Sequence, residues 1–274
     1  MKDYLKQLIS ERKPGQPERS IVREYLQARI LQSLQDSGAF LDWVFHGGTA
    51  LRFLYSIPRY SDALDFALID PARAHRFQEH LAQLRTTFEA ENYTAQLKVN
   101  DRKTVVSAFV RFLGLLYELG ISPHKTEVIS VKVEVDTNPP PGAITETTLI
   151  RKYVTLNLCH HDRASLLAGK INAVLMRGYT KGRDLYDLVW YLADRTWPPP
   201  NLMLLNAGLN QTGWQGPAVT PSNWRLLLTD RLEKLNWEQA ISDVHPFLER
   251  QSDLNIITKE KVMGLVRKGK VGPV

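Results

Sequence analysis

The glycine pair Gly47 and Gly48 constrains the fold most strongly, because it separates a short apolar run from a segment with helical spacing. The run LDWVF, residues 41–45, predicts a buried strand. TALRFLYSI, which follows the glycines, predicts a helix that begins near Thr49, and ALDFALI, residues 63–69, predicts a second strand. This part of the chain therefore requires a sheet with at least one helix packed on it.

Helices are expected on both sides of this unit. Residues 19–37 carry apolar side chains at helical spacing, and Pro71 is expected to open a helix that runs to about residue 91. From about residue 93 to 157 the pattern becomes β-branched and strand-like. The segments are YTAQLKV, TVVSAFVRFLGLLYEL, TEVISVKVEVD and ITETTLIRKYVTLNL.

The pattern becomes helical again after Asp162, and further helices are expected after the prolines at 198–200. We therefore predict an α+β fold with a mixed-sheet lobe followed by a helical lobe. The expected lobes are residues 1–160, which include an N-terminal helix, and residues 161–274.

Composition excludes several classes of protein. The single cysteine, Cys159, rules out an internal disulfide and a cysteine-rich zinc site. No run of about 18 uncharged apolar residues suggests a membrane span, and the N-terminus has no signal-peptide core, so a cytoplasmic protein without membrane association is expected. The net charge of +6 suits a polyanionic partner such as RNA or a nucleoside triphosphate.

The glycine pair also suggests chemistry. Backbone N–H groups at a helix start, together with the Thr49 hydroxyl, can bind a phosphate, although the same two glycines could form only a tight turn. On the following strand, positions 63 and 65 share a face, so carboxylates there would converge on the same metal ions. Only Asp65 is acidic, because position 63 is Ala63, and Asp62 points the other way as a solvated residue.

A further carboxylate could come from VKVEVD, residues 131–136. Alternation places Lys132, Glu134 and Asp136 on one face, which is also the pattern of an ordinary half-exposed strand. Glu134 is therefore a candidate metal ligand, with a purely structural role as the alternative.

The last candidate group lies in residues 163–192. Helical spacing puts Lys170 on the side of the apolar stripe, so its ammonium needs a negative partner. Asp184 and Asp187 share a face of the next helix and could hold Lys170 or Arg177 in place. Asp184 could equally cap the N-terminus of that helix. Arg183 lies in the same acidic and basic segment.

At these residues the sequence resembles the AbiEii/AbiGii-type, MenT-like nucleotidyltransferase toxins of the DNA polymerase β-like superfamily. HGGTALRFLYSIPRYSDALDF, residues 46–66, is similar to the GGT start and RxSxDxDF strand of that family. LLAGKINAVLMRGYTKGRDLYDL, residues 166–188, is similar to its lysine-bearing helix and RDxxD segment. The order and spacing of the four motifs agree, and the resemblance spans roughly residues 20–195.

The resemblance implies a role for each matching residue. Asp65, Lys170 and Asp184 would be catalytic, and Asp65 would bind Mg²⁺ or Mn²⁺. Glu134 is not part of the matching motifs and stays the further candidate ligand that strand alternation offers. Arg183 and Asp187 would support the site. The residues that would bind the nucleoside triphosphate are Gly47, Gly48, Thr49, Arg59, Ser61, Lys170 and Arg177.

The family resemblance also implies a reaction and partners. The expected function is that of a toxin of a toxin–antitoxin system, which transfers a nucleotide from a nucleoside triphosphate to RNA, at the 3′ end of tRNA, and is paired with a cognate antitoxin protein. Transfer to a protein hydroxyl is an alternative that the motifs do not separate.

Ala63 departs from the family pattern, which has an aspartate there. One explanation is a natural pseudoenzyme that binds nucleotide, RNA or a protein without catalysis. The other is a deliberate Asp→Ala change that silences an enzyme toxic to its host, and the otherwise intact motifs favour it. Either way, we expect the present chain to be inactive or nearly so.

Overall fold

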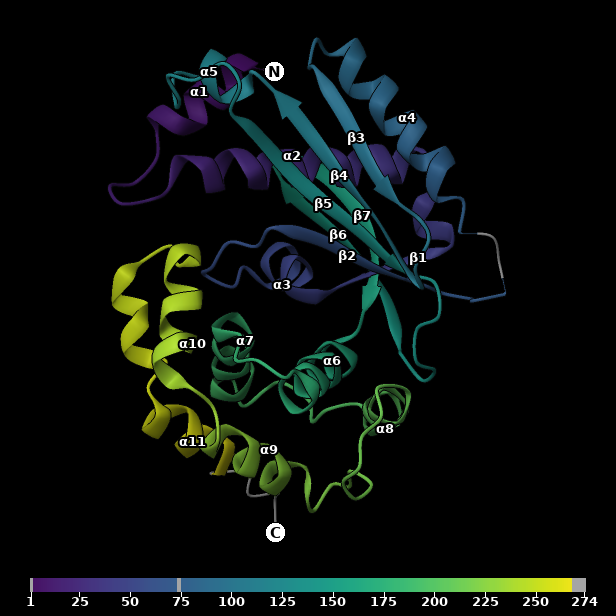
Figure 1. The fold of residues 1–274 in the computed structure, drawn as a ribbon, viewed down its shortest axis with the longest axis vertical. Helices are drawn as coiled ribbons and strands as arrows, with labels where there is room; N and C mark the ends of the chain where they lie inside the picture. Colours follow the sequence, from purple (N-terminus) through teal and green to yellow (C-terminus); the bar gives the residue numbers. More distant parts are fainter. Residues whose placement is uncertain (1, 73–74, 268–274) are drawn as a thin grey trace. The chain divides into compact units, whose positions relative to one another are not determined.

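The computed structural model describes residues 2–72 and 75–267 (Figure 1). Within these ranges the chain forms two compact units. The first comprises residues up to 139 together with 146–160, and the second comprises residues 140–145 together with the chain from 161 onward. Residues 140–145 join the second unit through hydrogen bonds: Asn201 donates to the Gly142 carbonyl at 2.7 Å, and Ile144 accepts from the Asp162 N–H at 2.9 Å.

A seven-stranded sheet forms the body of the first unit, in the order β3-β4-β5-β2-β1-β7-β6. Strand β2 pairs antiparallel with β1 and parallel with β5, so the sheet is mixed, as predicted. The strands are β1 (Trp43–His46), β2 (Ala63–Leu68), β3 (Ala95–Asn100), β4 (Val105–Leu113), β5 (Val128–Asp136), β6 (Thr145–Lys152) and β7 (Val154–His161).

The helices of the first unit precede the sheet or connect its strands. They are α1 (Lys2–Ser10), α2 (Glu18–Asp36), the 3-10 helix η1 (Ala39–Leu41), α3 (Gly47–Tyr55), α4 (Phe77–Ala90) and α5 (Leu115–Glu118). The second unit is helical. Its helices are α6 (Arg163–Met176), α7 (Gly182–Ala193), α8 (Leu202–Gln211), α9 (Trp224–Glu233), α10 (Trp237–Val244), η2 (His245–Phe247), η3 (Gln251–Ile256) and α11 (Lys259–Arg267).

The two faces of the sheet have different roles. Helix α2 packs against β5 and α4 against β3, and they cover one face (Figure 1). The core lies beneath them, where the Trp43 ring contacts Phe66 of β2 and Phe77 of α4. Because side chains alternate along a strand, the half-buried residues between the core positions of β2 and β5 lie on the opposite face.

Three expected elements differ in the structure. Helix α4 begins at Phe77 rather than at Pro71, because the Asp70 carboxylate accepts from the Ala72 N–H at 2.9 Å and closes a turn. The strand expected to continue past residue 113 ends there, since Gly114 adopts a φ of +70° and α5 follows. The strand expected over 144–158 is the hairpin of β6 and β7, which turns at Tyr153 with a φ of +62°.

Candidate functional site

The N-terminus of α3 lies directly against the carboxylate of Asp65. Helix α3 follows β1, and the register of β1 and β2 places His46 opposite Asp65. Gly47 has a φ of +78°, and a Cβ atom on it would lie 2.5 Å from Asp65 Oδ2. Glycine is therefore required at position 47 both by the backbone conformation and by the space that the carboxylate occupies.

Arg59 and Ser61 lie beside Gly48, the second glycine of the pair. A Cβ atom on Gly48 would lie 2.6 Å from the Arg59 guanidinium and 3.2 Å from the Ser61 hydroxyl. Arg59 is almost fully buried, and its Nη1 donates to the Tyr60 carbonyl at 2.9 Å. A guanidinium, a hydroxyl and the positive end of a helix of nine residues thus share one place, which is a combination suited to anions.

Thr49 serves the framework in this structure. Its side chain is fully buried, and its hydroxyl donates to the backbone carbonyl of Ala63. This bond attaches α3 to the beginning of β2. The Thr49 hydroxyl thus helps to fix the helix relative to the strand, and its contact with a phosphate stays a prediction.

Helix α2 fixes the segment that carries Arg59 and Ser61. Gln27 donates to the Ser61 carbonyl at 2.8 Å, and Arg23 donates to the Asp62 carboxylate at 2.9 Å. Asp62 is thus an ion-pair partner of α2 on the far side from Asp65. Sequence reasoning missed Arg23 and Gln27, because their distance in the sequence from residues 59–62 gives no signal of contact.

A buried ion pair reinforces the same segment. The carboxylate of Glu24, on α2, accepts from Arg52 of α3 and lies 3.2 Å from the Lys152 ammonium. Arg52 also donates to the Ile57 carbonyl at 2.8 Å, and Tyr153 donates to Glu24 at 2.7 Å. Burial alone would raise the pKa of Glu24, but the charges of Lys152 and Arg52 and the hydrogen bonds to Glu24 outweigh burial, so its pKa is lowered.

Strands β2 and β5 place four candidate residues side by side. The parallel register pairs Ala63 with Lys132 and Asp65 with Glu134. All four lie on the face opposite α2 and α4, as alternation predicts. The Lys132 ammonium lies 2.7 Å from Glu134 Oε1, so the carboxylate expected to bind a metal is held by a lysine.

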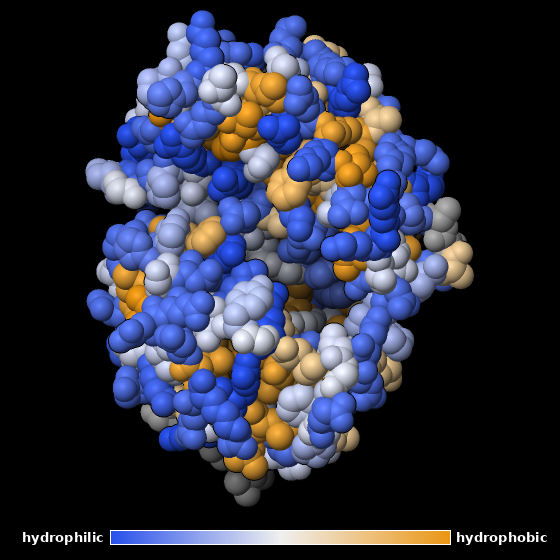
Figure 2. Space-filling view, in the orientation of Figure 1, coloured by the Kyte–Doolittle hydropathy of each residue, from blue (hydrophilic) through white to orange (hydrophobic). Residues whose placement is uncertain are grey.

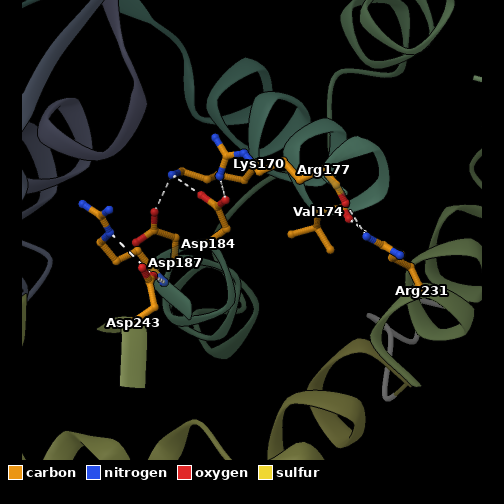
Figure 3. Close-up of polar contacts among 8 residues, drawn as sticks. Lys170, Val174, Arg177, Asp184, Asp187, Arg231 and Asp243 are labelled. Atoms are coloured by element: carbon orange, nitrogen blue, oxygen red, sulfur yellow. Dashed lines mark hydrogen bonds and ion pairs between the residues drawn. The ribbon is translucent and has the colours of Figure 1, made fainter. Parts of the chain in front are cut away.

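The second unit brings together another group of predicted residues (Figure 3). The Lys170 ammonium of α6 lies 3.0 Å from Asp184 Oδ1 and 2.6 Å from Asp187 Oδ2, both on α7. Arg177 is also ion-paired with Asp184. Both aspartates are buried and Lys170 is mostly so, which confirms the expectation that these carboxylates hold Lys170 and Arg177.

Two arginines stabilise the surroundings of this cluster. Arg231 of α9 donates to the Val174 carbonyl at 3.1 Å and to the Arg177 carbonyl, so it completes the C-terminus of α6 (Figure 3). Arg183 points to the other side of α7, where its Nε lies 3.8 Å from Asp243 and its guanidinium lies over the Phe247 ring. Arg183 thus attaches α7 to the helices that follow, and Arg231 is a supporting residue that sequence reasoning missed.

The family model for the nucleotidyl transferase AbiEii toxin of type IV toxin–antitoxin systems matches residues 29–257. The chain belongs to this AbiEii toxin family. The match includes the glycine pair, the β2 aspartate and the Lys170 cluster, so family membership confirms the resemblance inferred from the motifs. An AbiEii toxin is a nucleotidyltransferase of a toxin–antitoxin system, which implies a nucleoside triphosphate substrate and an antitoxin partner.

Solved structures share the fold of this AbiEii protein at low sequence identity. JHP933 from Helicobacter pylori aligns with a TM-score of 0.55 and 18% identity, covering 93% of this chain and 93% of that chain. The MenT4 nucleotidyltransferase toxin from Mycobacterium tuberculosis H37Rv aligns with a TM-score of 0.53 and 15% identity, covering 97% and 99%. No curated protein matches the sequence significantly.

The metal site that such nucleotidyltransferases usually have is incomplete in this AbiEii chain. Of Ala63, Asp65, Lys132 and Glu134, only Asp65 and Glu134 are acidic, and Glu134 is bound to Lys132. Among residues 2–72 and 75–267, no group of three or more His, Cys, Asp or Glu side chains is arranged to hold a metal ion. The residues present therefore do not fit a pair of divalent ions.

In the described part of the chain, no helix is both long and apolar enough to cross a membrane. On the face in view in Figure 2, hydrophilic residues cover much of the surface and hydrophobic residues form smaller patches between them.

Proposed function

We propose that this chain is a nucleotidyltransferase toxin silenced at Ala63, whose active form transfers a nucleoside monophosphate to the 3′ end of a tRNA, with pyrophosphate as the leaving group. The observation that carries the proposal is the placement of the Asp65 carboxylate against Gly47, beside Arg59 and Ser61. A carboxylate next to an anion-binding helix start would hold a divalent cation against the phosphates, and that cation would offset the negative charge of the reacting group. Family membership supports the same chemistry.

In the first unit, each part has one task. The α3 N–H groups and Arg59 bind phosphate oxygens, and the Ser61 hydroxyl adds a hydrogen bond. Asp65 would be one of the carboxylates that hold a divalent cation beside them. Glu24 and Gln27 keep the Arg59 segment in place through the contacts described above, so the cation is oriented before the nucleotide arrives.

In the second unit, Lys170 is the phosphate-contacting cation and Asp184 is the family's acid. Asp187 and Asp184 together hold the Lys170 ammonium, which fixes the direction of its side chain. Arg177 shares Asp184 and offers a second positive charge to the nucleotide. These groups stabilise charge and do not themselves form covalent bonds.

Ala63 makes the present chain inactive or nearly so. In the active form, an aspartate at position 63 would face the same side as Asp65 and Glu134 and would supply a further oxygen ligand for Mg²⁺ or Mn²⁺. Loss of one such ligand lowers the rate by orders of magnitude while the strand keeps its fold, since alanine fits on a half-buried strand position. We further propose that the chain acts in the cytoplasm and binds a cognate antitoxin.

The variant Ala63→Asp tests the function. Each labelled nucleoside triphosphate is incubated with magnesium, total RNA and either the unchanged chain, Ala63→Asp or Ala63→Asn. We expect label on RNA only with Ala63→Asp, because asparagine has the same shape without the charge. Loss of the label on treatment with RNase supports an RNA acceptor, whereas loss only with protease would identify a protein hydroxyl. A folded Ala63→Asp variant that transfers no label would contradict the proposal.

The alternative is a module that binds nucleotide, RNA or a partner without catalysis. Ala63 and the ion pair between Lys132 and Glu134 favour it, since both reduce the capacity for metal binding. It becomes the leading function if Ala63→Asp transfers nothing while both forms bind nucleotide equally well.

A further inference from the structure

The ammonium of Lys132 makes the candidate site less negative. In the parallel pairing of β2 with β5, Lys132 lies opposite Ala63, and Glu134, two residues further on, lies opposite Asp65. The four residues carry two carboxylates and one ammonium, which gives a formal charge of −1. An aspartate at position 63 would make that charge −2. A divalent cation is therefore attracted less strongly by the present chain, and the carboxylate of Glu134 already has a cationic partner.

The Lys132 ammonium is held on the open face of the sheet. Its contact with Glu134 Oε1 is 2.7 Å, and it lies 5.7 Å from the centre of the Phe109 ring, which is its register neighbour on β4. The side chain is 34% exposed, so a ligand can reach the ammonium without unfolding the strand. A compact charge on a flexible stem is suited to phosphate oxygens.

The phosphate-binding helix start lies on the other side of β2 from β5. Asp65 contacts Gly47 at the start of α3 and is paired in register with Glu134 of β5. Arg59 is next to Gly48 at the same helix start. A polyphosphate lying across β2 would thus meet positive groups on both sides of Asp65, from the start of α3 and from Lys132.

We propose that Lys132 takes the place of a metal ion in this chain, so that the chain binds the triphosphate of a nucleotide without any divalent cation. The inference rests on the proposed nucleotide site. It concerns how the present residues bind the phosphates. It makes binding and catalysis separable, since the lysine neutralises phosphate charge but cannot activate an attacking hydroxyl in the manner of a metal ion.

The experiment measures binding of ATP, GTP, CTP, UTP and inorganic triphosphate by calorimetry, once with EDTA and once with magnesium. We expect the unchanged chain to bind its preferred nucleotide with the same dissociation constant in both conditions. Lys132→Met should weaken binding in EDTA about tenfold or more, because a charge-assisted contact is lost. Ala63→Asp should shift binding towards dependence on magnesium.

Lys98→Met is the matched control. Lys98 is paired with Phe109, which is paired with Lys132, so both lysines lie on the same face and two strands apart. Its removal takes away the same charge and should leave the affinity within about twofold. Thermal unfolding of each variant confirms that the strands remain intact.

Three results would overturn the proposal. Binding by the unchanged chain that requires magnesium, or equal losses in Lys132→Met and Lys98→Met, would show that Lys132 does not replace a metal ion. Binding by Ala63→Asp with magnesium and none by the unchanged chain would also overturn it, while the nucleotidyltransferase function would stand. If no form binds any nucleotide or transfers label, the proposed function fails as well.

Discussion

At the scale of single residues, Gly47 connects backbone conformation to the chemistry of the site. Its φ of +78° is unfavourable for any residue with a Cβ atom, and that atom would meet Asp65 Oδ2 at 2.5 Å. The two costs can be separated, because Gly120 has a φ of +72° with open space around its missing side chain. Comparison of the two glycines therefore isolates the contact with the carboxylate.

We expect Gly120→Ala to lower the free energy of unfolding by about 1 kcal/mol, the cost of the backbone conformation alone. Gly47→Ala should lower it by about 1 kcal/mol more, because Asp65 or the helix start must move. It should also weaken nucleotide binding, which Gly120→Ala should not. Urea unfolding and calorimetric titration measure both quantities. Equal effects of the two substitutions would contradict this account of the Gly47 contact.

At the scale of elements, α6 and α7 are joined by the ion pairs of Lys170. The ammonium is shared by two buried carboxylates, of which Asp184 has Arg177 as a second partner. Loss of Lys170 therefore removes one positive charge from two buried carboxylates, while Asp184 keeps its ion pair with Arg177. Removal of one member of a buried ion pair is more destabilising than removal of both, because an uncompensated charge stays buried.

Lys170→Met should accordingly lower the free energy of unfolding by about 3 kcal/mol. The double variant Lys170→Met with Asp187→Asn should recover part of that loss, whereas Lys170→Met with Asp184→Asn should recover less, since Arg177 still needs its partner. Denaturant unfolding of the single and double variants measures these couplings. Recovery by neither second substitution would mean that Lys170 contributes through packing rather than charge.

Helix α2 is the other element with a decisive role, because it anchors α3, the Arg59 segment and the β6–β7 turn. Glu24 accepts from Arg52 and from Tyr153, and its pKa is lowered below the ordinary value of 4.5. In the folded state Glu24 therefore stays ionised at a pH where the unfolded chain binds a proton. The stability that this group contributes is fully present above pH 4.5 and is lost as the pH falls through its folded pKa.

Glu24→Gln should thus be less stable than the unchanged chain by about 3 kcal/mol at neutral pH, since Arg52 and Lys152 lose the charge of their partner. The difference between the two proteins should shrink as the pH is lowered from 5 to 3. Chemical unfolding at a series of pH values measures the difference. A difference that does not change with pH would show that the Glu24 charge does not stabilise the fold.

At the scale of the whole molecule, the chain divides its chemistry between two units. The sheet unit contains the helix start, Arg59, Asp65 and Lys132, and the helical unit contains the Lys170 cluster. Each group is held by contacts within its own unit. The sequence order of the motifs reflects this division, since the glycine pair, Asp65 and Glu134 precede residue 137 and the lysine-bearing helix follows residue 162.

Local patterns in the sequence determined much of the fold and of the candidate site. Apolar periodicity predicted α2, α6 and α7, and β-branched runs predicted most strands, because these signals depend on neighbours within a few residues. Turn chemistry was harder to predict. The Asp70 turn delays α4 to Phe77, and the turn at Tyr153 has its side-chain hydroxyl bonded to Glu24 of α2, which is far away in the sequence.

The sequence by itself determined which residue types are available to the site: the glycine pair, one aspartate where the family has two, and a lysine with two aspartates near it in sequence. Only the tertiary structure decided that Asp65 touches Gly47, that Thr49 bonds to β2, and that Lys132 lies beside Ala63. The physical reason is that strand register depends on packing of the entire sheet, and a shift of one residue would turn every side chain to the other face.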